Sequence, residues 1–387
     1  MMMRRGISAS SPSRSSCATS TFSDSRNVSI STGQNSAISV FDDTMDAISL
    51  PWWLFAVFAV LAWLLTGALR RYALTHNVID VPNARSSHKT PTPRGGGIAF
   101  VISFLVGLGT LAATGNVAPV DALALGGAGA WIALIGFLDD HGHIQARWRL
   151  LAHFAGAAWV LYWIGGVPSV SLWGLELQSG WMLSILGALY LVWMLNLYNF
   201  MDGIDGIASI EALCVTVGGC ILYVLAGQPL AAAPSALLAA TVAGFLIWNF
   251  PPAKIFMGDG GSGFLGLILG ALSLLAGWHS PAMLWAWLVL LGVFIIDATV
   301  TLIRRLCRGE KVYEAHRTHA YQYASRKYSS HRRVTLTVLA INVLWLFPWA
   351  VAISTGYIEG LTATICAYIP LIALSILLKA GTPEGSN

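Results

Sequence analysis

Charge is scarce in this sequence. Only 10% of its 387 residues are Asp, Glu, Lys or Arg, whereas 56% are hydrophobic. Soluble domains carry about 25% charged residues, and a soluble fold could not cover this much apolar surface with so few charges. We therefore expect lipid to surround most of the chain. Sixteen Trp and eleven Tyr agree with this, because their amphipathic rings favour membrane interfaces.

Cysteine is also sparse, with five residues and no C-x-x-C pair, which argues against a zinc site or a disulfide framework. The net charge of +4 is small, and we expect no nucleic-acid partner. Residues 1–44 lack the apolar segment of a secretory signal and are rich in Ser. We expect them to be disordered. A transit peptide is one alternative, and our preferred hypothesis is a non-native extension before a start at Met45.

Long apolar runs alternate with short polar segments after Met45. A helix needs about 20 residues to cross a hydrocarbon core of ~30 Å, and its backbone groups must bond within the segment. We therefore predict an all-α, polytopic transmembrane helical bundle with about eleven spans. The predicted spans are 51–69, 96–114, 120–138, 150–167, 181–198, 207–227, 232–250, 262–278, 281–303, 334–354 and 359–378.

Basic residues are confined to alternate loops. Of the 22 Lys and Arg residues, four lie in residues 1–44, and all the others lie where eleven spans would place them on one side. The positive-inside rule makes this side cytoplasmic, with the N-terminus outside and the C-terminus inside. Most carboxylates and imidazoles lie there too, which suggests a site for a phosphorylated, metal-bound ligand. The predicted cytoplasmic loops are 70–95, 139–149, 199–206, 251–261 and 304–333, with a short tail at 381–387.

The first candidate motif is the acidic pair Asp139-Asp140 at the end of the third predicted span. Adjacent carboxylates repel each other unless a cation lies between them or one keeps a proton. Arg147 and Arg149 follow closely, and paired acids before paired bases would suit a diphosphate with its Mg²⁺. The alternative is a solvated loop whose acidic residues have no function.

The second motif lies at the end of the fifth predicted span. Asn196, Asn199 and Asp202 are spaced by three, so a continuing helix would present them on one face. Asp205 follows, in the second of two Asp-Gly pairs. Polar groups this close to lipid are costly unless they are used or paired, which favours a functional role over the alternative of an interfacial turn.

The third motif is Gly258-Asp259-Gly260, followed by two more glycines before the eighth predicted span. Such a loop before a helix can direct backbone N–H groups at a phosphate, and Asp259 could bind Mg²⁺. It is not a Walker A loop, because no Lys follows the last glycine. The alternative is a flexible re-entrant turn.

The fourth motif is His316-Arg317-Thr318-His319 in the long loop 304–333. His316 and His319 would share a helix face, and without a third ligand they make a weak metal site. Beside Arg317 they suit phosphate or sugar contacts. The alternative is a basic loop that contacts lipid headgroups.

The first cytoplasmic loop carries His88, Lys89 and Arg94. These residues could bind the headgroup of a polyprenyl phosphate, although positive-inside charges alone would also explain them. Inside the ninth predicted span, Asp297 lies two turns before Arg304, and we expect the two to pair.

Together these motifs give a resemblance that covers roughly residues 50–380. Their order and predicted topology are similar to those of the polyprenyl-phosphate N-acetylhexosamine-1-phosphate transferases. This family includes the O-antigen-initiating enzymes and phospho-MurNAc-pentapeptide translocase. The sequence looks closest to the O-antigen-initiating branch, because the loop reads His316-Arg317-Thr318-His319-Ala320-Tyr321-Gln322 and not a run of three His.

The resemblance implies a membrane transferase domain at 45–380 in a bacterial inner membrane, with its active site facing the cytoplasm. Undecaprenyl phosphate would attack the sugar-linked phosphorus of a UDP-amino sugar and release UMP. The implied cofactor is Mg²⁺, with Mn²⁺ as an alternative. The sequence leaves open which sugar is used and the oligomeric state, for which a homodimer is one option.

The resemblance also implies roles for single residues. Asp259 resembles the principal metal ligand and Asn199 a second metal contact. Asp139 and Asp140 resemble paired acids that act on the metal, on the lipid phosphate or in its deprotonation, and the sequence leaves open whether an Asp is a base or a covalent nucleophile. The remaining implied site residues are Asp202 and Asp205 in the Asp-Gly motif, His316 and His319 on the substrate side, and Gly258 and Gly260. Relatives often carry Lys where His143 stands here, and we expect Arg147 to replace it.

Two other functions remain open from the sequence. A multi-pass transporter could have this many spans, but its polar groups should gather near the membrane midplane and not at one interface. Another lipid-phosphate enzyme, such as a membrane phosphatase or a phospholipid synthase, could also use acidic metal-binding loops.

Overall fold

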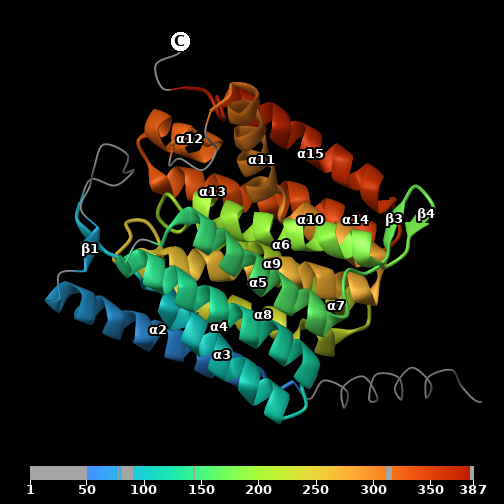
Figure 1. Cartoon of the computed structure of the whole chain (residues 1–387), viewed down its shortest axis with the longest axis horizontal. Coiled ribbons are helices and arrows are strands. Elements are labelled where there is room, and N and C mark those ends of the chain that lie inside the picture. The colour runs from blue at the N-terminus through green and yellow to red at the C-terminus, as the bar shows by residue number, and fades with distance from the viewer. Residues whose placement is uncertain (1–49, 77, 81–89, 143, 311–315, 384–387) are drawn as a thin grey trace, which may run out of the picture. The chain divides into compact units, whose positions relative to one another are not determined.

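The computed structural model describes residues 50–76, 78–80, 90–142, 144–310 and 316–383. Long helices run alongside one another in this part of the chain, and two short hairpins lie at opposite ends (Figure 1). Strand β1 (Ile79–Asp80) pairs with β2 (Thr92–Pro93), and β3 (Val170–Leu172) pairs with β4 (Leu175–Leu177), both antiparallel. The predicted fold class, a polytopic helical membrane protein, is confirmed. The predictions for residues 1–44, His88 and Lys89 lie outside the described residues.

Each predicted span coincides with a helix or with a broken helix. The helices are α2 (Trp52–Thr75), α3 (Gly97–Ala113), α4 (Pro119–Gly142), α5 (Ala146–Ile164), α6 (Trp181–Met201), α7 (Ile207–Leu225), α8 (Ala233–Asn249, after the 3₁₀ turn η1, Pro229–Ala232), α9 (Asp259–His279), α10 (Pro281–Leu290), α11 (Gly292–Cys307), α12 (Ala320–Tyr328), α13 (His331–Ile341), α14 (Phe347–Ser354) and α15 (Gly360–Leu377). Within the described residues, eight helical segments are long and apolar enough to cross a membrane, or nine if α10 and α11 form one bent span. The count of eleven and the orientation stay predictions.

Two predicted spans are not continuous α-helices. Helices α10 and α11 meet at an angle of 70°, where 281–303 was expected to be one helix. Gly292 follows the break and packs tightly, because a Cβ atom there would lie 2.9 Å from the ring of Tyr368. In the span 334–354, a π-helical turn, η2 (Asn342–Leu346), separates α13 from α14. Pro348 has no N–H to continue the regular ladder, which accounts for the change in pitch.

Helix α9 lies at the centre of the bundle, and nearly all of its residues are buried. Its Phe264 ring packs against Phe100 and Phe104 of α3, with ring centres 6.0 and 5.5 Å apart. Helices α4 and α6 pack along its other sides. The N-terminus of α9, which begins at Asp259, is therefore enclosed by elements that carry the other candidate motifs.

Glycines allow backbones to touch at the first turn of α9. A Cβ atom on Gly136 of α4 would lie 2.5 Å from the Cα atom of Gly260, and one on Gly97 of α3 would lie 2.6 Å from the Cα atom of Gly261. Small residues at such crossings let membrane helices approach closely. Because Asp139 and Asp140 follow Gly136 and Arg94 precedes Gly97, these crossings carry three charged side chains toward Asp259.

We expect Gly136→Ala to reduce stability, because the added methyl group would overlap the backbone of α9 and overpacking of this kind costs about 1–3 kcal/mol or more. The measurement is the thermal unfolding midpoint of the protein purified in detergent. Gly109→Ala in α3 is the control, since no atom lies within 4 Å of its added Cβ. Equal midpoints for both variants and the wild type would contradict the close crossing.

Candidate active site

Arg94 joins two carboxylates from different helices. Its Nη2 atom lies 2.9 Å from Oδ1 of Asp140 and 2.6 Å from Oδ1 of Asp259. The other carboxylate oxygen of Asp140 accepts a hydrogen bond of 3.0 Å from the backbone N–H of Asp259. Charge-assisted hydrogen bonds are about twice as strong as neutral ones. The first loop, the end of α4 and the start of α9 are thus tied together at one point.

The loop Gly258-Asp259-Gly260 leaves room for this contact. Gly258 has φ of +81°, and a Cβ atom there would lie 2.7 Å from Oδ2 of Asp140, so only glycine leaves room for that carboxylate. Gly260 packs instead against Ile98 of α3 and the backbone of α4. We expected the N–H groups of this loop to face a phosphate, but in the structure Asp140 accepts the first of them and so caps α9.

A cavity of about 240 Å³ opens beside this cluster. Of the predicted site residues, its lining includes Arg94, Asn199, Asp202, Asp205, Gly258 and Asp259. It also includes residues that were not predicted as site residues, among them Asp80, Asn249, Ser262, Gln322 and His331. Asn249 carried a usable signal, since it is a polar residue at the end of a predicted span. His331 carried no such signal, because it comes from the next helix beyond the histidine motif.

The cavity concentrates negative charge. Loss of hydration, together with the nearby carboxylates of Asp259, Asp140 and Asp205, raises the pKa of Asp202 well above its usual range, and Arg94 opposes this only in part. Among the described residues, the Asp202 side chain has no hydrogen-bond or ion-pair partner, and neither has Oδ2 of Asp259. A cation that entered the cavity would therefore be attracted strongly.

The donor set fits Mg²⁺ better than a metal bound by protein ligands alone. Within the described ranges, no three His, Cys, Asp or Glu side chains are grouped closely enough to hold a metal by themselves. Mg²⁺ in phosphoryl-transfer sites is usually held by one or two carboxylates and completes its shell with water and substrate phosphates. Asp259, Asp202 and the amide of Asn199 supply oxygen ligands of this kind at one cavity wall.

Asp139 and Asp140 point to different partners and do not share a cation. One oxygen of Asp139 accepts the backbone N–H of Ile144 at 2.7 Å, and the other lies 2.6 Å from Nη1 of Arg149. Consecutive residues on a helix point about 100° apart, which explains why the pair separates. Asp139 lines a narrow crevice on the far side of Asp259, and both of its oxygens are already engaged by protein groups.

Arg149, and not Arg147, is the basic residue beside the acidic motif. The Arg147 guanidinium lies 5.6 Å from the ring centre of Trp148 and lines neither the cavity nor the crevice. Asn196 is also separated from the cavity. Its amide donates to the carbonyl of Val192 at 2.7 Å, and it lines the crevice with Asp139. Asn199 borders both spaces.

Asp205 connects three segments. One oxygen accepts the N–H of Ala253 at 3.0 Å, and the other lies 3.1 Å from Nδ1 of His331. Its backbone carbonyl accepts from the hydroxyl of Thr335 at 2.9 Å. The side chain thereby holds the Asp-Gly turn against the loop that precedes Asp259 and against α13.

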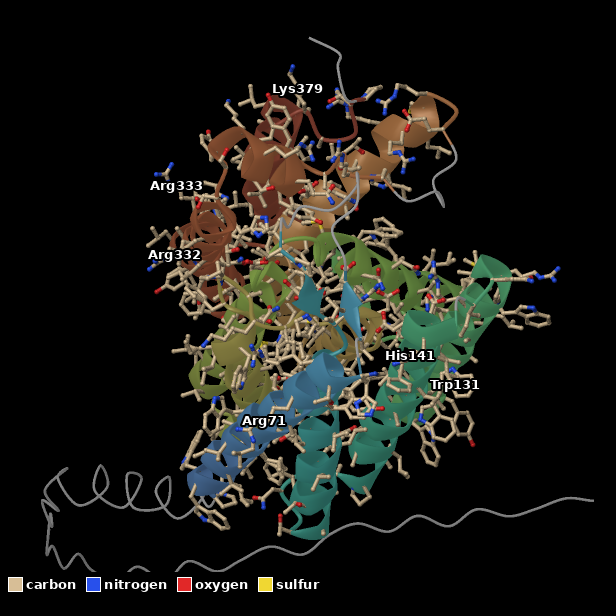
Figure 2. All side chains as sticks on the ribbon, turned by 90° about the vertical axis from the view of Figure 1, so that its left-hand side faces the viewer. Arg71, Trp131, His141, Arg332, Arg333 and Lys379 are labelled. Atoms are coloured by element: carbon tan, nitrogen blue, oxygen red, sulfur yellow. The ribbon has the colours of Figure 1, made fainter. Side chains whose placement is uncertain are left out.

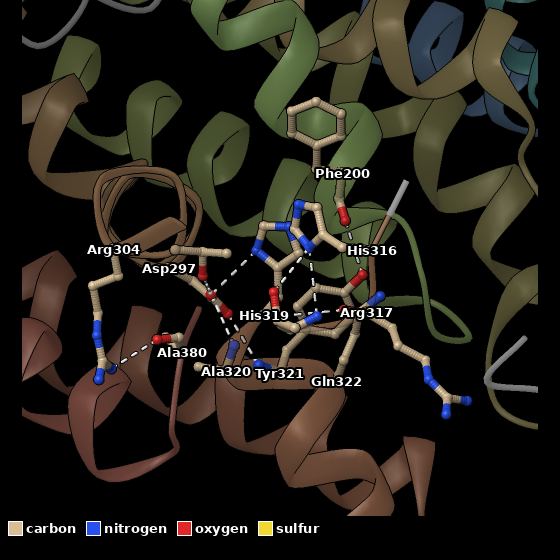
Figure 3. Close-up of polar contacts among 12 residues, drawn as sticks. Phe200, Asp297, Arg304, His316, Arg317, His319, Ala320, Tyr321, Gln322 and Ala380 are labelled. Carbon is tan, nitrogen blue, oxygen red and sulfur yellow. Dashed lines mark hydrogen bonds and ion pairs between the residues drawn. The ribbon is translucent and has the colours of Figure 1, made fainter. Parts of the chain in front are cut away.

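The two motif histidines stack on each other next to Asp297 and Phe200 (Figure 3). The ring centres of His316 and His319 are 4.8 Å apart, and each lies 6.3 Å from Phe200, the residue after Asn199. Burial and His319 lower the pKa of His316 to about 3, so its imidazole is neutral at physiological pH. Neither histidine lines the cavity, whereas Gln322 does. The Arg317 side chain extends away from the pair.

Asp297 does not pair with Arg304, contrary to our expectation. Its two oxygens accept the backbone N–H groups of Ala320 and Tyr321 at 2.9 and 3.0 Å, so it caps the start of α12. It also lies 3.4 Å from Nδ1 of His319. Tyr321 then donates from its hydroxyl to the carbonyl of Phe200 at 2.9 Å, which ties α12 to the end of α6.

Basic side chains surround this end of the bundle. Figure 2 looks onto it, with Arg71, Arg332, Arg333 and Lys379 around the rim. Strand β1 and helix α12, which contribute Asp80 and Gln322 to the cavity lining, lie at the end opposite to the β3–β4 hairpin (Figure 1).

Comparisons with known proteins identify the family of the chain. The model of glycosyl transferase family 4 matches residues 122–277. A decaprenyl-phosphate N-acetylglucosaminephosphotransferase of Mycolicibacterium smegmatis is 30% identical, over 85% of this chain and 89% of its own length. A probable undecaprenyl-phosphate N-acetylglucosaminyl 1-phosphate transferase of Bacillus subtilis is 28% identical, over 83% of this chain and 88% of its own length. A phospho-N-acetylmuramoyl-pentapeptide-transferase of Streptococcus pneumoniae is 30% identical, over 58% of this chain and 72% of its own length. The chain belongs to glycosyl transferase family 4 and is a membrane enzyme of the polyprenyl-phosphate hexosamine-1-phosphate transferase kind.

Proposed function

We propose that this enzyme transfers N-acetylhexosamine 1-phosphate from a UDP-sugar to undecaprenyl phosphate at the cytoplasmic face of a bacterial inner membrane. An oxygen of the lipid phosphate forms a bond to the sugar-linked phosphorus, the bond from that phosphorus to the bridging oxygen breaks, and UMP leaves. The product is a lipid-diphospho-sugar that starts an O-antigen or a related cell-envelope polysaccharide.

The observation that carries this proposal is the convergence of Arg94, Asp140 and Asp259 beside a cavity bordered by Asn199 and Asp202. Both reactants are anions that repel each other. Catalysis of phosphoryl transfer rests mainly on positioning and on neutralising charge. A site with opposed charges at one end of a membrane bundle suits a lipid phosphate that stays in the bilayer and a nucleotide sugar that arrives from water.

Arg94 is placed to bind phosphate oxygens. Both of its ion pairs use the same nitrogen, Nη2. A guanidinium has five N–H donors, and 41% of this side chain is exposed. Its remaining donors can therefore bind the diphosphate while Asp140 and Asp259 hold its orientation.

Asp259, Asn199 and Asp202 would hold Mg²⁺. When bound, Mg²⁺ supplies positive charge that neutralises the phosphates and orients them. The lipid phosphate is already ionised at pH 7, so its attack needs no strong protein base. Asp140 fixes the N-terminus of α9, and the Asp139–Arg149 pair fixes the end of α4.

The position of the cavity favours the transferase over the transporter alternative. Asp202 follows the end of α6 and Asp259 begins α9, so these carboxylates of the cavity lie at helix ends. A transport path would need polar groups near the midplane, at broken helices that face each other.

The direct test uses membranes that contain the expressed protein, with Mg²⁺, undecaprenyl phosphate and UDP-sugars labelled in the sugar. We expect labelled lipid and an equal amount of released UMP, and loss of both when EDTA removes the metal. Membranes without the protein are the control. If a panel of UDP-N-acetylhexosamines gives no labelled lipid with folded protein, the proposed function is wrong.

We expect Asp259→Asn to abolish measurable turnover, a loss of at least about 10²-fold, because the amide keeps the shape but loses the charge that binds the metal. Asp121→Asn is the matched control, since Asp121 lies in the first turn of α4, at the start of the helix whose other end carries the acidic motif. Both variants should elute as folded protein in size-exclusion chromatography. Near-normal turnover of Asp259→Asn would rule out Asp259 as an essential ligand.

Arg149→Met and Arg147→Met separate the two basic residues. Without Arg149 the carboxylate of Asp139, whose side chain is 5% exposed, loses its cation, and we expect kcat/KM to fall by about tenfold or more. Arg147 makes no contact with the site, and its substitution should leave kcat/KM within about twofold. Steady-state kinetics with both substrates provide the measurement, and the reverse ranking would restore Arg147 as the phosphate contact.

A further inference from the structure

One face of α11 carries four polar residues. Asp297, Thr301, Arg304 and Arg308 are separated by four, three and four residues, so they lie on one side of the helix. Asp297 caps α12, and the hydroxyl of Thr301 donates to Asp297 at 3.2 Å. The two arginines instead bind the chain that follows α15. A single helix face therefore contacts both the segment 316–319 before α12, which we call the histidine loop, and the C-terminal segment.

The C-terminal segment Lys379–Gly381 is built into the structure. Nη1 of Arg304 donates to the carbonyl of Ala380 at 2.7 Å, and Nη2 of Arg308 donates to that of Gly381. Ala380 is fully buried. Gly381 has φ of +69°, and a Cβ atom there would lie 2.9 Å from the carbonyl oxygen of Thr301. Only glycine fits this position, because both the backbone conformation and the contact exclude a side chain.

This segment also contacts the histidine loop directly. The N–H of Gly381 donates to the carbonyl of Thr318 at 2.6 Å. Thr318 stands between the two histidines, and its hydroxyl lies 3.0 Å from Nδ1 of His316. Figure 3 shows the Arg304–Ala380 contact beside the Asp297–His319 cluster. The backbone of the loop is thus held by Asp297 at the start of α12, by Nη1 of Arg326, which donates to the carbonyl of Arg317 at 3.0 Å, and by Gly381 at Thr318.

We propose that Lys379–Gly381 is a positioning strap that holds His316 and His319 in place for the donor substrate. This inference rests on the proposed function, because it takes the loop before Gln322, a residue of the cavity lining, as part of the donor site. No other part of the described chain donates to the Thr318 carbonyl. Without the strap, the loop would keep the contacts of Asp297 and Arg326 and would lose the hydrogen bond at the Thr318 carbonyl.

The strap should affect binding more than turnover. The histidine loop leads into α12, whose Gln322 lines the cavity, and the ring of His319 lies 6.3 Å from that of Phe200 in α6, which adjoins Asn199 of the cavity lining. The cluster of Arg94, Asp140 and Asp259 is held by α3, α4 and α9, and the contacts of the strap are with α11, α12 and the loop before it. A released loop should therefore raise KM for the UDP-sugar and leave kcat and KM for the lipid phosphate nearly unchanged.

The test compares full-length protein with chains that end after Leu378 or after Pro383. The shorter chain lacks the strap, whereas the longer one keeps it and is the control. We expect the shorter chain to show a KM for the UDP-sugar raised about tenfold, and faster amide hydrogen exchange in a peptide covering residues 316–322. The chain ending after Pro383 should match full-length protein in both measurements.

Point variants keep the test valid if the shorter chain does not fold. Gly381→Val displaces the strap, and Gly356→Val is its control, because Gly356 has a similar φ of +76° with no atom within 4 Å of an added Cβ. We expect only Gly381→Val to change exchange in 316–322. Unchanged exchange and unchanged KM in both strap variants would overturn the inference. A wild-type protein without transferase activity would overturn the proposed function instead, and the exchange measurement would still decide whether the strap holds the loop.

Discussion

The contact of Arg94 with Asp140 and Asp259 is the interaction on which the site depends. A guanidinium and two carboxylates meet at the edge of a lipid-embedded bundle, where unpaired charges are expensive. Removing one member would leave the others partly buried without compensation. The contact also fixes the backbone, because Asp140 caps α9 and Gly258 leaves room for it. The charge that a phosphorylated substrate needs is in this way made part of the fold.

The apolar core brings these charges together. Helix α9 is buried along nearly its whole length, and its first turn has glycines where α3 and α4 cross it. A Cβ atom on Gly136 or Gly97 would lie 2.5 or 2.6 Å from the backbone of α9, so side chains there would push the helices apart and disturb the contact of Arg94 with both carboxylates. Packing at Gly136 and Gly97 therefore sets the distances in the polar cluster, although neither residue has any chemistry of its own.

The second half of the chain adds a separate support for the substrate side. The break between α10 and α11 redirects α11, whose polar face then meets α12, the histidine loop and the C-terminal segment. Polar residues inside membrane segments are retained where they bind one another or serve a site. Asp297 illustrates this, since its oxygens are used by backbone N–H groups of α12 and by Thr301. The acidic cluster and the histidine loop are thus positioned by different helices and are linked through the end of α6.

The sequence alone determined the fold class, the approximate position of each helix and the family, because lipid imposes long apolar runs and because the polar motifs are local and ordered. It also indicated which segments carry the chemistry.

The tertiary structure decided which side chains meet. Nothing in the spacing of Asp139 and Asp140 showed that one would pair with Arg149 and the other with Arg94, or that Asp297 would cap α12 and not pair with Arg304. Likewise, only the fold brought His331 to Asp205 and Gly381 to Thr318. These partners come from distant helices, and their meeting depends on how the glycine-lined crossings and the bent α11 set the helices in space.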